Sequence, residues 1–368
     1  MVTKIGLALG LASLLICPVV CGACGGGDDS SGAGPGGGGA GTDGGGALAD
    51  GGGPSGNDGG STETDGGTAS DSGTPIGTAP TLPPDAGSAC TIFPADNPWN
   101  TDVSDTTKFP TDPHSDNYIA FIQGSGTKNV HPDFGSDPSY GIPYIVVPGT
   151  TPKIAVTFDV ADESDPGPYP IPLTTPLESG SDSHAIAIDK DACKLYELDA
   201  AHVKGSGWQA YSGALFDLKT NALRTDGFTS ADAAGLPIFA GLARLYEVKA
   251  GAIHHALRVT IAKSAHKFVH PATHSAGGST DPYAPPMGMR LRLKAGYDTS
   301  ALKGSALVIA TALKHYGLLV ADNSGGGNNW FISGETNTGW NDDELDLLKA
   351  VPGTAFEVVT VGTTIAGD

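Results

Sequence analysis

The feature that most constrains this 368-residue chain is a long glycine-rich stretch near its N-terminus. Residues 25–88 hold 24 of the 55 glycines and nine acidic residues, but no aromatic residue, lysine or arginine. Such a composition cannot bury enough apolar surface to offset the entropy that is lost on ordering. We therefore expect a flexible tether with an r.m.s. span of roughly 45 Å, followed by a single folded domain over residues 89–368.

Residues 1–24 have the features of an export signal. Lys4 precedes an apolar run over residues 5–20, and small residues follow it. The run is shorter than the about 20 residues that span a bilayer. The pair Gly22-Ala23 before Cys24 resembles the cleavage site of bacterial lipoproteins, which implies lipidation of Cys24 and a membrane anchor. Cleavage as an ordinary secretory signal is the alternative. We expect an exported protein of the cell envelope, as an outer-membrane or cell-surface lipoprotein.

Charge and cysteine content limit the partners. The chain has a formal net charge of −20 and no cluster of basic residues. Nucleic acid is therefore not expected as a partner, because phosphate neutralisation needs Lys and Arg. Polyanionic glycans are disfavoured less strongly, since a local cationic cleft can form on an acidic protein. After the signal only Cys90 and Cys193 remain, and in an exported domain two cysteines predict one disulfide.

The folded part is predicted to be mainly β. Short apolar runs alternate with clusters of Gly, Pro, Asn and Asp, which favours a β-sandwich or jelly-roll-like arrangement of antiparallel sheets. In residues 289–294 apolar side chains alternate with Arg and Lys, which predicts a half-buried strand with a cationic face. Strands are expected at residues 142–147, 153–160, 184–189, 193–198, 255–262, 289–295, 318–322, 330–334 and 355–361.

About three short helices are expected as well. Residues 115–124 begin with Ser115 as a possible cap, and residues 305–317 end in Gly317, which favours a helix stop. Residues 341–351 begin with Asn341 and have Glu344 three residues later, the spacing of a capping box. The same spacing predicts a short turn at residues 229–235.

Five of the ten histidines lie between residues 254 and 275. In a strand His255 shares the apolar face with Leu257, whereas Arg258 lies on the more polar face. His255 is then either a hydrogen-bonded core residue or a group that orients a substrate. His270 and His274 have the spacing of two helix-borne ligands, but Pro271 disfavours a helix. No HExxH or Cys–His pattern of the zinc type occurs, so neither a metal nor a cofactor is predicted.

Several carboxylates stand near aromatic residues, which is the requirement of glycoside hydrolysis. One carboxyl donates a proton to the leaving oxygen, and another attacks or activates water. Each residue also has a simple structural role, such as capping a turn or solvating a loop. The candidate acids and bases are Asp133, Glu163, Asp165 and Asp232, with His131, His255 and Arg258 to orient substrate. The candidate substrate-binding residues are Tyr169, Trp208 and Trp330, as stacking platforms, and Asp322 and Asn323.

Six motifs carry a resemblance to a family of exported bacterial proteins of unknown activity. They are HPDFGS (131–136), DPGPYPIP (165–172), TSADAAGLPI (229–238), HALR (255–258), PPMGMRLRLK (285–294) and ADN (321–323). The resemblance implies a single exported domain and no particular activity.

Three functions remain open on these grounds. The first is a metal-free hydrolase of a neutral polysaccharide. The second is a polysaccharide lyase, which needs cations to neutralise a uronate and a base for its C5 proton. The third is a non-catalytic surface module that binds a glycan or a partner protein. The lyase candidates are Arg258, Arg290, Arg292, His255 and Tyr169. Oligomeric state is not predicted.

Overall fold

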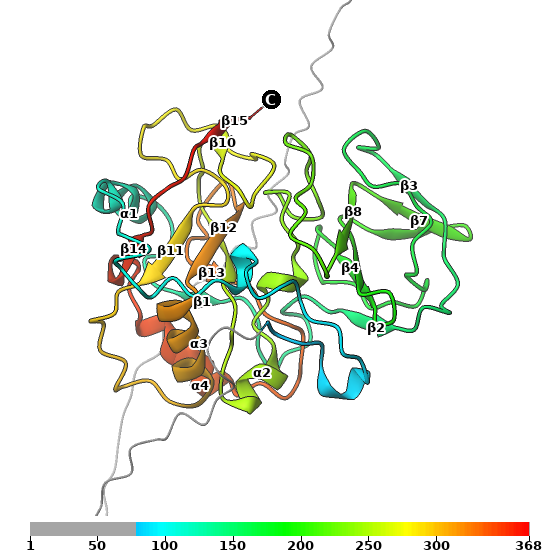
Figure 1. The fold of residues 1–368 in the computed structure, drawn as a ribbon, viewed down its shortest axis with the longest axis horizontal. Coiled ribbons are helices and arrows are strands. Elements are labelled where there is room, and N and C mark those ends of the chain that lie inside the picture. The colour runs from blue at the N-terminus through cyan, green and yellow to red at the C-terminus, as the bar shows by residue number, and fades with distance from the viewer. Residues whose placement is uncertain (1–78, 368) are drawn as a thin grey trace, which may run out of the picture. The chain divides into compact units, whose positions relative to one another are not determined.

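The computed structural model describes residues 79–367 (Figure 1). The predicted export signal with Cys24 and most of the predicted linker lie outside these residues. The described part is mainly β with few helices, as the sequence predicts, and a strand is found within each of the nine predicted ranges. Residues 79–88, predicted as linker, lie against the domain, and Leu82 is only 1% exposed. The folded part therefore includes these residues.

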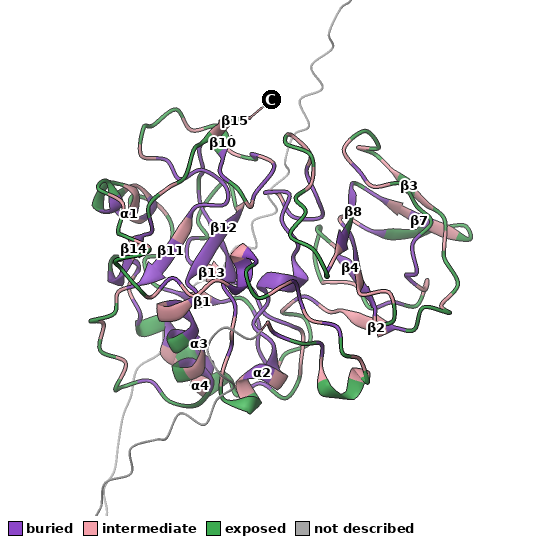
Figure 2. Ribbon diagram, in the orientation of Figure 1, coloured by how far each residue is buried: buried purple, intermediate pink, exposed green. Residues whose placement is uncertain are grey.

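The largest sheet has six strands (Figure 1). Strand β1 (His131–Pro132) pairs in parallel with β13 (Phe331–Ile332), and β9 (Leu257–Ile261) pairs in parallel with β12 (Leu318–Asn323). The other neighbours in this sheet are antiparallel. The central strands are largely buried (Figure 2), and their apolar side chains belong to the main hydrophobic core. The order is β1 (His131–Pro132), β13 (Phe331–Ile332), β9 (Leu257–Ile261), β12 (Leu318–Asn323), β11 (Arg290–Leu293) and β14 (Phe356–Val358).

Two smaller sheets are formed by residues 145–217. The first has four strands in the order β2 (Ile145–Val147), β4 (Ala185–Asp189), β5 (Lys194–Leu198) and β8 (Gly213–Asp217). The second has the order β3 (Val156–Phe158), β7 (Gly207–Ala210) and β6 (His202–Lys204). A separate hydrophobic cluster that includes Tyr169 and Trp208 lies in this part of the chain. A two-stranded sheet joins β10 (Lys267–Phe268) to β15 (Ile365–Ala366).

The three predicted helices are present as α1 (Ser115–Gln123), α3 (Gly304–His315) and α4 (Asp342–Leu345), the last continued by a 3-10 turn. Asn341 caps α4 by accepting the Glu344 N–H. Ser115 does not cap α1, because its hydroxyl instead accepts the Val358 N–H. Helix α2 (Leu245–Ala250) was not predicted. None of the helices within residues 79–367 combines the length and apolar composition that a membrane crossing requires.

The predicted cationic face of β11 is not a solvent-facing surface. Arg292 is buried and donates to Glu357 and to backbone carbonyls, while Arg290 donates to the carbonyl of Tyr316. The segment that follows Pro98 covers this face and supplies carbonyl acceptors. A planar guanidinium satisfies several acceptors at once, so alternating Arg and Leu here indicates a strand buried on both faces.

The predicted disulfide between Cys90 and Cys193 is present, with the two Cα atoms 5.6 Å apart. It joins the start of the folded part to the turn before β5. The chain-entropy relation gives about 4–5 kcal/mol as an upper contribution for a loop of this length.

Candidate functional site

A cavity of about 290 Å³ lies where the four-stranded sheet meets the large sheet. We call it the Asp322 cleft. The polar side chains that line it come from strands, from residues just outside strands and from the loop at residues 229–233. The residues on which the argument depends are His184, Asp199, Tyr211, Asp232, Arg258 and Asp322.

Strand pairing explains why these side chains converge. Ala185 of β4 pairs with Leu198 of β5, so His184 before one strand and Asp199 after the other lie at the same end of the hairpin. In the parallel pair β9–β12, a register shift after Val320 places Asp322 opposite Thr260. Thr260 is two residues from Arg258 and shares its face of the sheet. The irregularity therefore brings Asp322 to the side that carries Arg258.

Asp232 and Arg258 form a buried ion pair in the cleft wall. Arg258 Nη2 lies 2.9 Å from Asp232 Oδ1, and Nη1 donates to Ser333 Oγ at 2.7 Å. Burial raises the pKa of Asp232, and the Arg258 charge opposes this shift. Burial disfavours the charged guanidinium, but Asp232 keeps the pKa of Arg258 above its ordinary value. The arginine is thus a fixed cation whose charge is already balanced.

His184 is a second cation held by acceptors. Its Nδ1 contacts the Glu178 carboxylate, and its Nε2 lies 2.9 Å from the Ala231 carbonyl and 3.7 Å from Asp199. Since both ring nitrogens face only acceptors, both carry protons. Burial lowers the pKa of His184, but the hydrogen bond to Glu178 and the charges of Glu178 and Asp199 raise it to about 9. The imidazolium therefore holds the 229–233 loop against the hairpin.

Asp322 and Asp199 are two cleft carboxyls whose pKa values are raised toward neutrality. Burial raises the pKa of each to about 6, against Arg258 in one case and His184 in the other. The charges of Asp182 and Asp232 raise both pKa values further, so the two carboxyls share one set of neighbouring charges. Carboxyls that titrate near pH 6 can donate and accept protons close to neutrality.

Tyr211 supplies an aromatic surface at the cleft. Its side chain is 48% exposed, although large apolar residues are generally buried in this domain. It lines the cleft directly after β7. A tyrosine ring in this position can stack on the apolar face of a sugar.

Three of the predicted site residues lie in this cleft, namely Asp232, Arg258 and Asp322. His131 and Asp133 line a separate hollow of about 420 Å³. Burial raises the pKa of Asp133, and the charges of Glu178 and Arg258 also act on it. The hollow is thus electrostatically coupled to the cleft.

Glu163 and Asp165 have structural contacts. Glu163 Oε2 accepts the Thr229 N–H at 3.1 Å, and Asp165 Oδ2 accepts the Leu215 N–H at 2.8 Å and pairs with Arg224. They join the proline-rich loop to β8 and to the start of the 229–233 loop. Neither lines the Asp322 cleft.

His255 is a core histidine, which is one of the two roles that the sequence allowed. It is fully buried, and its Nε2 lies 3.1 Å from Glu247, which also pairs with Arg244. Burial and the Arg244 charge lower the pKa of His255. It has no route to a substrate in the Asp322 cleft.

The prediction that three aromatic residues act as stacking platforms for a sugar is wrong. Tyr169, Trp208 and Trp330 are 2% exposed or less and cannot receive a sugar ring. Tyr169 and Trp208 donate to the carbonyls of Asp165 and Ile171. Asn323 donates to Ser264 and lines a different cavity.

Sequence reasoning missed His184, Asp199 and Tyr211. Each stands immediately outside a strand, where a polar side chain ends an apolar run. The same signal appears at many turns, so only the pairing of strands singles these three out.

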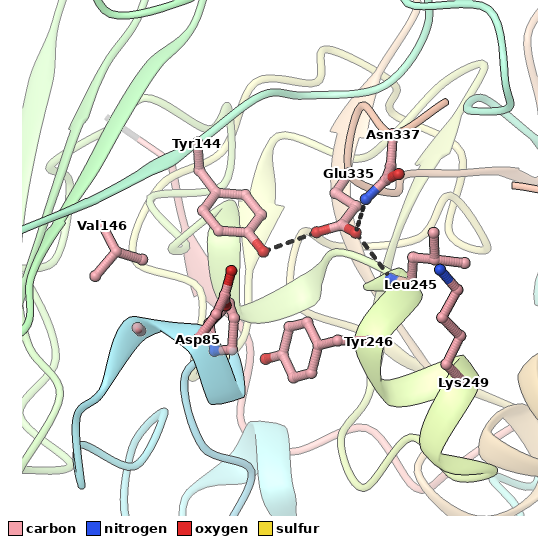
Figure 3. A pocket seen from close by; sticks show the side chains of 10 residues that line it. Asp85, Tyr144, Val146, Leu245, Tyr246, Lys249, Glu335 and Asn337 are labelled. Carbon is pink, nitrogen blue, oxygen red and sulfur yellow. Dashed lines mark hydrogen bonds between the residues drawn. The ribbon is translucent and has the colours of Figure 1, made fainter. Parts of the chain in front are cut away.

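A second cavity, of about 460 Å³, contains a carboxylate that accepts several hydrogen bonds from the protein, unlike Asp322 in the cleft (Figure 3). We call it the Glu335 pocket. Tyr144 Oη donates to Glu335 Oε2 at 2.7 Å, and the Leu245 N–H and the Asn337 amide donate to Oε1, each at 3.0 Å. The 3-10 turn at Pro84–Ala86 lines it too. Its central carboxylate is committed to structural hydrogen bonds.

Within residues 79–367 no group of three or more His, Cys, Asp or Glu side chains is arranged to hold a metal ion. Comparisons with models of protein families, with curated proteins and with solved structures found no match to this chain. Function is therefore argued from the cleft.

Proposed function

We propose that the chain is an exported, lipid-anchored hydrolase of a neutral polysaccharide that acts through the Asp322 cleft. The observation that carries the proposal is the presence, in one cleft, of two carboxyls whose pKa values are about 6. Glycoside hydrolysis needs such a pair, one protonated and one ionised.

The two carboxyls have different surroundings, which assigns their roles. Among residues 79–367, Asp322 accepts only the Asn323 N–H at 2.7 Å and a long contact from Thr260 at 3.4 Å. It donates its proton to the glycosidic oxygen as the C–O bond breaks. Asp199 lies beside the His184 imidazolium, which favours its ionised form. It takes a proton from the water that forms the new bond to the anomeric carbon.

The charge of the cleft supports a neutral substrate. A lyase needs a cation to neutralise a uronate, but Arg258 is already paired with Asp232. Arg290 and Arg292 donate to groups elsewhere in the domain, and His255 and Tyr169 are buried. Asp182 adds a further negative charge beside Asp199 and Asp322. A uronate would meet repulsion here.

The disulfide supports export. Disulfides persist in oxidising compartments and are rare in the cytoplasm. Anchoring through Cys24 would then hold the domain at a membrane surface outside the cytoplasm.

The test is a reducing-sugar assay of the full chain on a panel of neutral glycans. Asp322→Asn and Asp199→Asn should each reduce the rate by about 100-fold or more. Asp162→Asn is the matched control, because this exposed carboxylate lies in a loop and lines no part of the cleft. Full activity in both cleft variants, or binding of a glycan without any cleavage, would overturn the proposal.

A parallel screen of uronic-acid polymers should give no unsaturated product. Absorbance of such a product would instead support the lyase.

A further inference from the structure

The hollow that contains Asp133 has no role in the proposed hydrolytic step. Its volume is about 420 Å³, which is enough for a sugar ring, and it opens to solvent. We call it the Asp133 hollow. Its lining includes His131, Asp133, Phe134, Tyr140, Asp346 and Lys349.

The hollow and the Asp322 cleft are connected across strand β13. The Asp133 N–H donates to the Ile332 carbonyl at 2.9 Å. Ser333, the residue directly after β13, accepts a hydrogen bond from Arg258 in the cleft wall at 2.7 Å. Glu178, which holds His184, also acts electrostatically on Asp133. The two cavities are therefore neighbours in one acidic region.

The hollow presents groups that recognise a neutral sugar. Tyr140 is 55% exposed, the highest value among the exposed large apolar and aromatic side chains. The His131 ring stacks on Phe331 with centroids 4.2 Å apart, and burial lowers its pKa, which favours the neutral form. The Asp133 carboxylate has no hydrogen-bond partner within residues 79–367. An aromatic face beside neutral and anionic acceptors suits a ring with several hydroxyls.

We infer that the Asp133 hollow binds a second sugar unit of the same polysaccharide chain that is cleaved in the Asp322 cleft. This inference rests on the proposed function. It implies that the enzyme prefers longer oligosaccharides, which fill both cavities, to shorter ones. Lys349 lies 2.6 Å from Asp346, and Asp137 and Asp342 also line the hollow, so that its negative charges outnumber this one lysine and disfavour a uronate.

The test compares oligosaccharides of increasing length from whichever neutral glycan is cleaved. For the native chain kcat/KM should rise until both cavities are filled. Tyr140→Ala should lower kcat/KM about three- to tenfold for the long oligosaccharides. The value of kcat/KM for the shortest oligosaccharide that is cleaved should not change. Tyr211→Ala should lower kcat/KM at every length.

Leu307→Ala is the control for removing an exposed side chain, because Leu307 lies on α3 and lines neither cavity. Calorimetric binding to the inactive Asp322→Asn variant gives a second readout. Affinity should increase with chain length, and addition of Tyr140→Ala should remove that increase.

The two failures are distinguishable. If Asp322→Asn and Asp199→Asn are fully active, the proposed function falls. If they are inactive but Tyr140→Ala changes rate and affinity equally at all lengths, or not at all, the hydrolase remains and the second subsite is wrong.

Discussion

The Glu335 pocket and the Asp322 cleft are each lined by a carboxyl group and a tyrosine, but the two carboxyl groups differ in the hydrogen bonds that they accept. Glu335 accepts three hydrogen bonds, from Tyr144, Leu245 and Asn337. Asp322 accepts one short backbone bond, and burial raises its pKa to about 6. A carboxylate saturated by protein donors stabilises the fold, whereas one that is desolvated and short of donors remains free to exchange a proton. The larger cavity is therefore the weaker candidate for catalysis.

The largest expected effect comes from exchanging the carboxyls of the two cavities for amides. Asp322→Asn should lower kcat by about 10²- to 10⁴-fold, because the proton donor is lost. Glu335→Gln should leave kcat within about twofold of the native rate, since this group makes no contact with the cleft. Initial rates under saturating substrate decide between them. Equal losses in the two variants would erase the distinction between the cavities.

The second prediction concerns the ion pair that forms the cleft wall. Asp232→Ala leaves the Arg258 charge buried without its partner, and should cost about 3–5 kcal/mol in the free energy of unfolding. The matched control is Asp346→Ala, which breaks the exposed pair with Lys349 and should have little effect. Urea denaturation measures both. A double variant that replaces Asp232 by Leu and Arg258 by Met should recover much of the loss.

The third prediction concerns the His184 imidazolium that lines the cleft. The pKa of His184 is raised to about 9, whereas an unfolded histidine titrates near 6.5. Its contribution to stability is therefore fully present below about pH 6.5, and is lost as pH rises through about 9. The urea midpoint should fall over this interval, and His184→Gln should flatten the fall. A native midpoint that stays constant between these pH values would mean that His184 is neutral.

The fourth prediction tests the structural role of the Glu335 pocket. Glu335→Gln replaces a charged acceptor by an amide that cannot accept from all three donors. The expected loss is about 1.5–3 kcal/mol in the free energy of unfolding. Asn337→Ala removes only one of the donors and should cost less. Denaturant midpoints rank the two variants, and the reverse order would mean that the Glu335 carboxylate is not the centre of this network.

Local patterns predicted elements well and the site only in part. The apolar run before Asp322 and the alternation around Arg258 identified β12 and β9, because a strand is specified by its own residues. The contact between Asp232 and Arg258 depends instead on how a loop returns to the sheet. The prediction of stacking residues was wrong for a related reason. Trp208 has the chemistry of a platform, but its ring belongs to the core of the smaller sheets, and burial is decided by the tertiary fold.

The smallest expected effect is the most specific test of why the Asp322 cleft differs from the Glu335 pocket. Asp182 raises the pKa of both Asp322 and Asp199 through its charge, and it lies at the exposed edge of the cleft. In the native chain kcat/KM should fall as pH rises through about 6, because Asp322 loses its proton. Asp182→Asn should move this alkaline limb to lower pH by a fraction of a unit, and high salt should reduce the difference between the two profiles. Asp162→Asn should leave the limb in place. An alkaline limb that does not move, or that moves to higher pH, would mean that the group titrating near pH 6 is not Asp322, and that the proton comes from another residue.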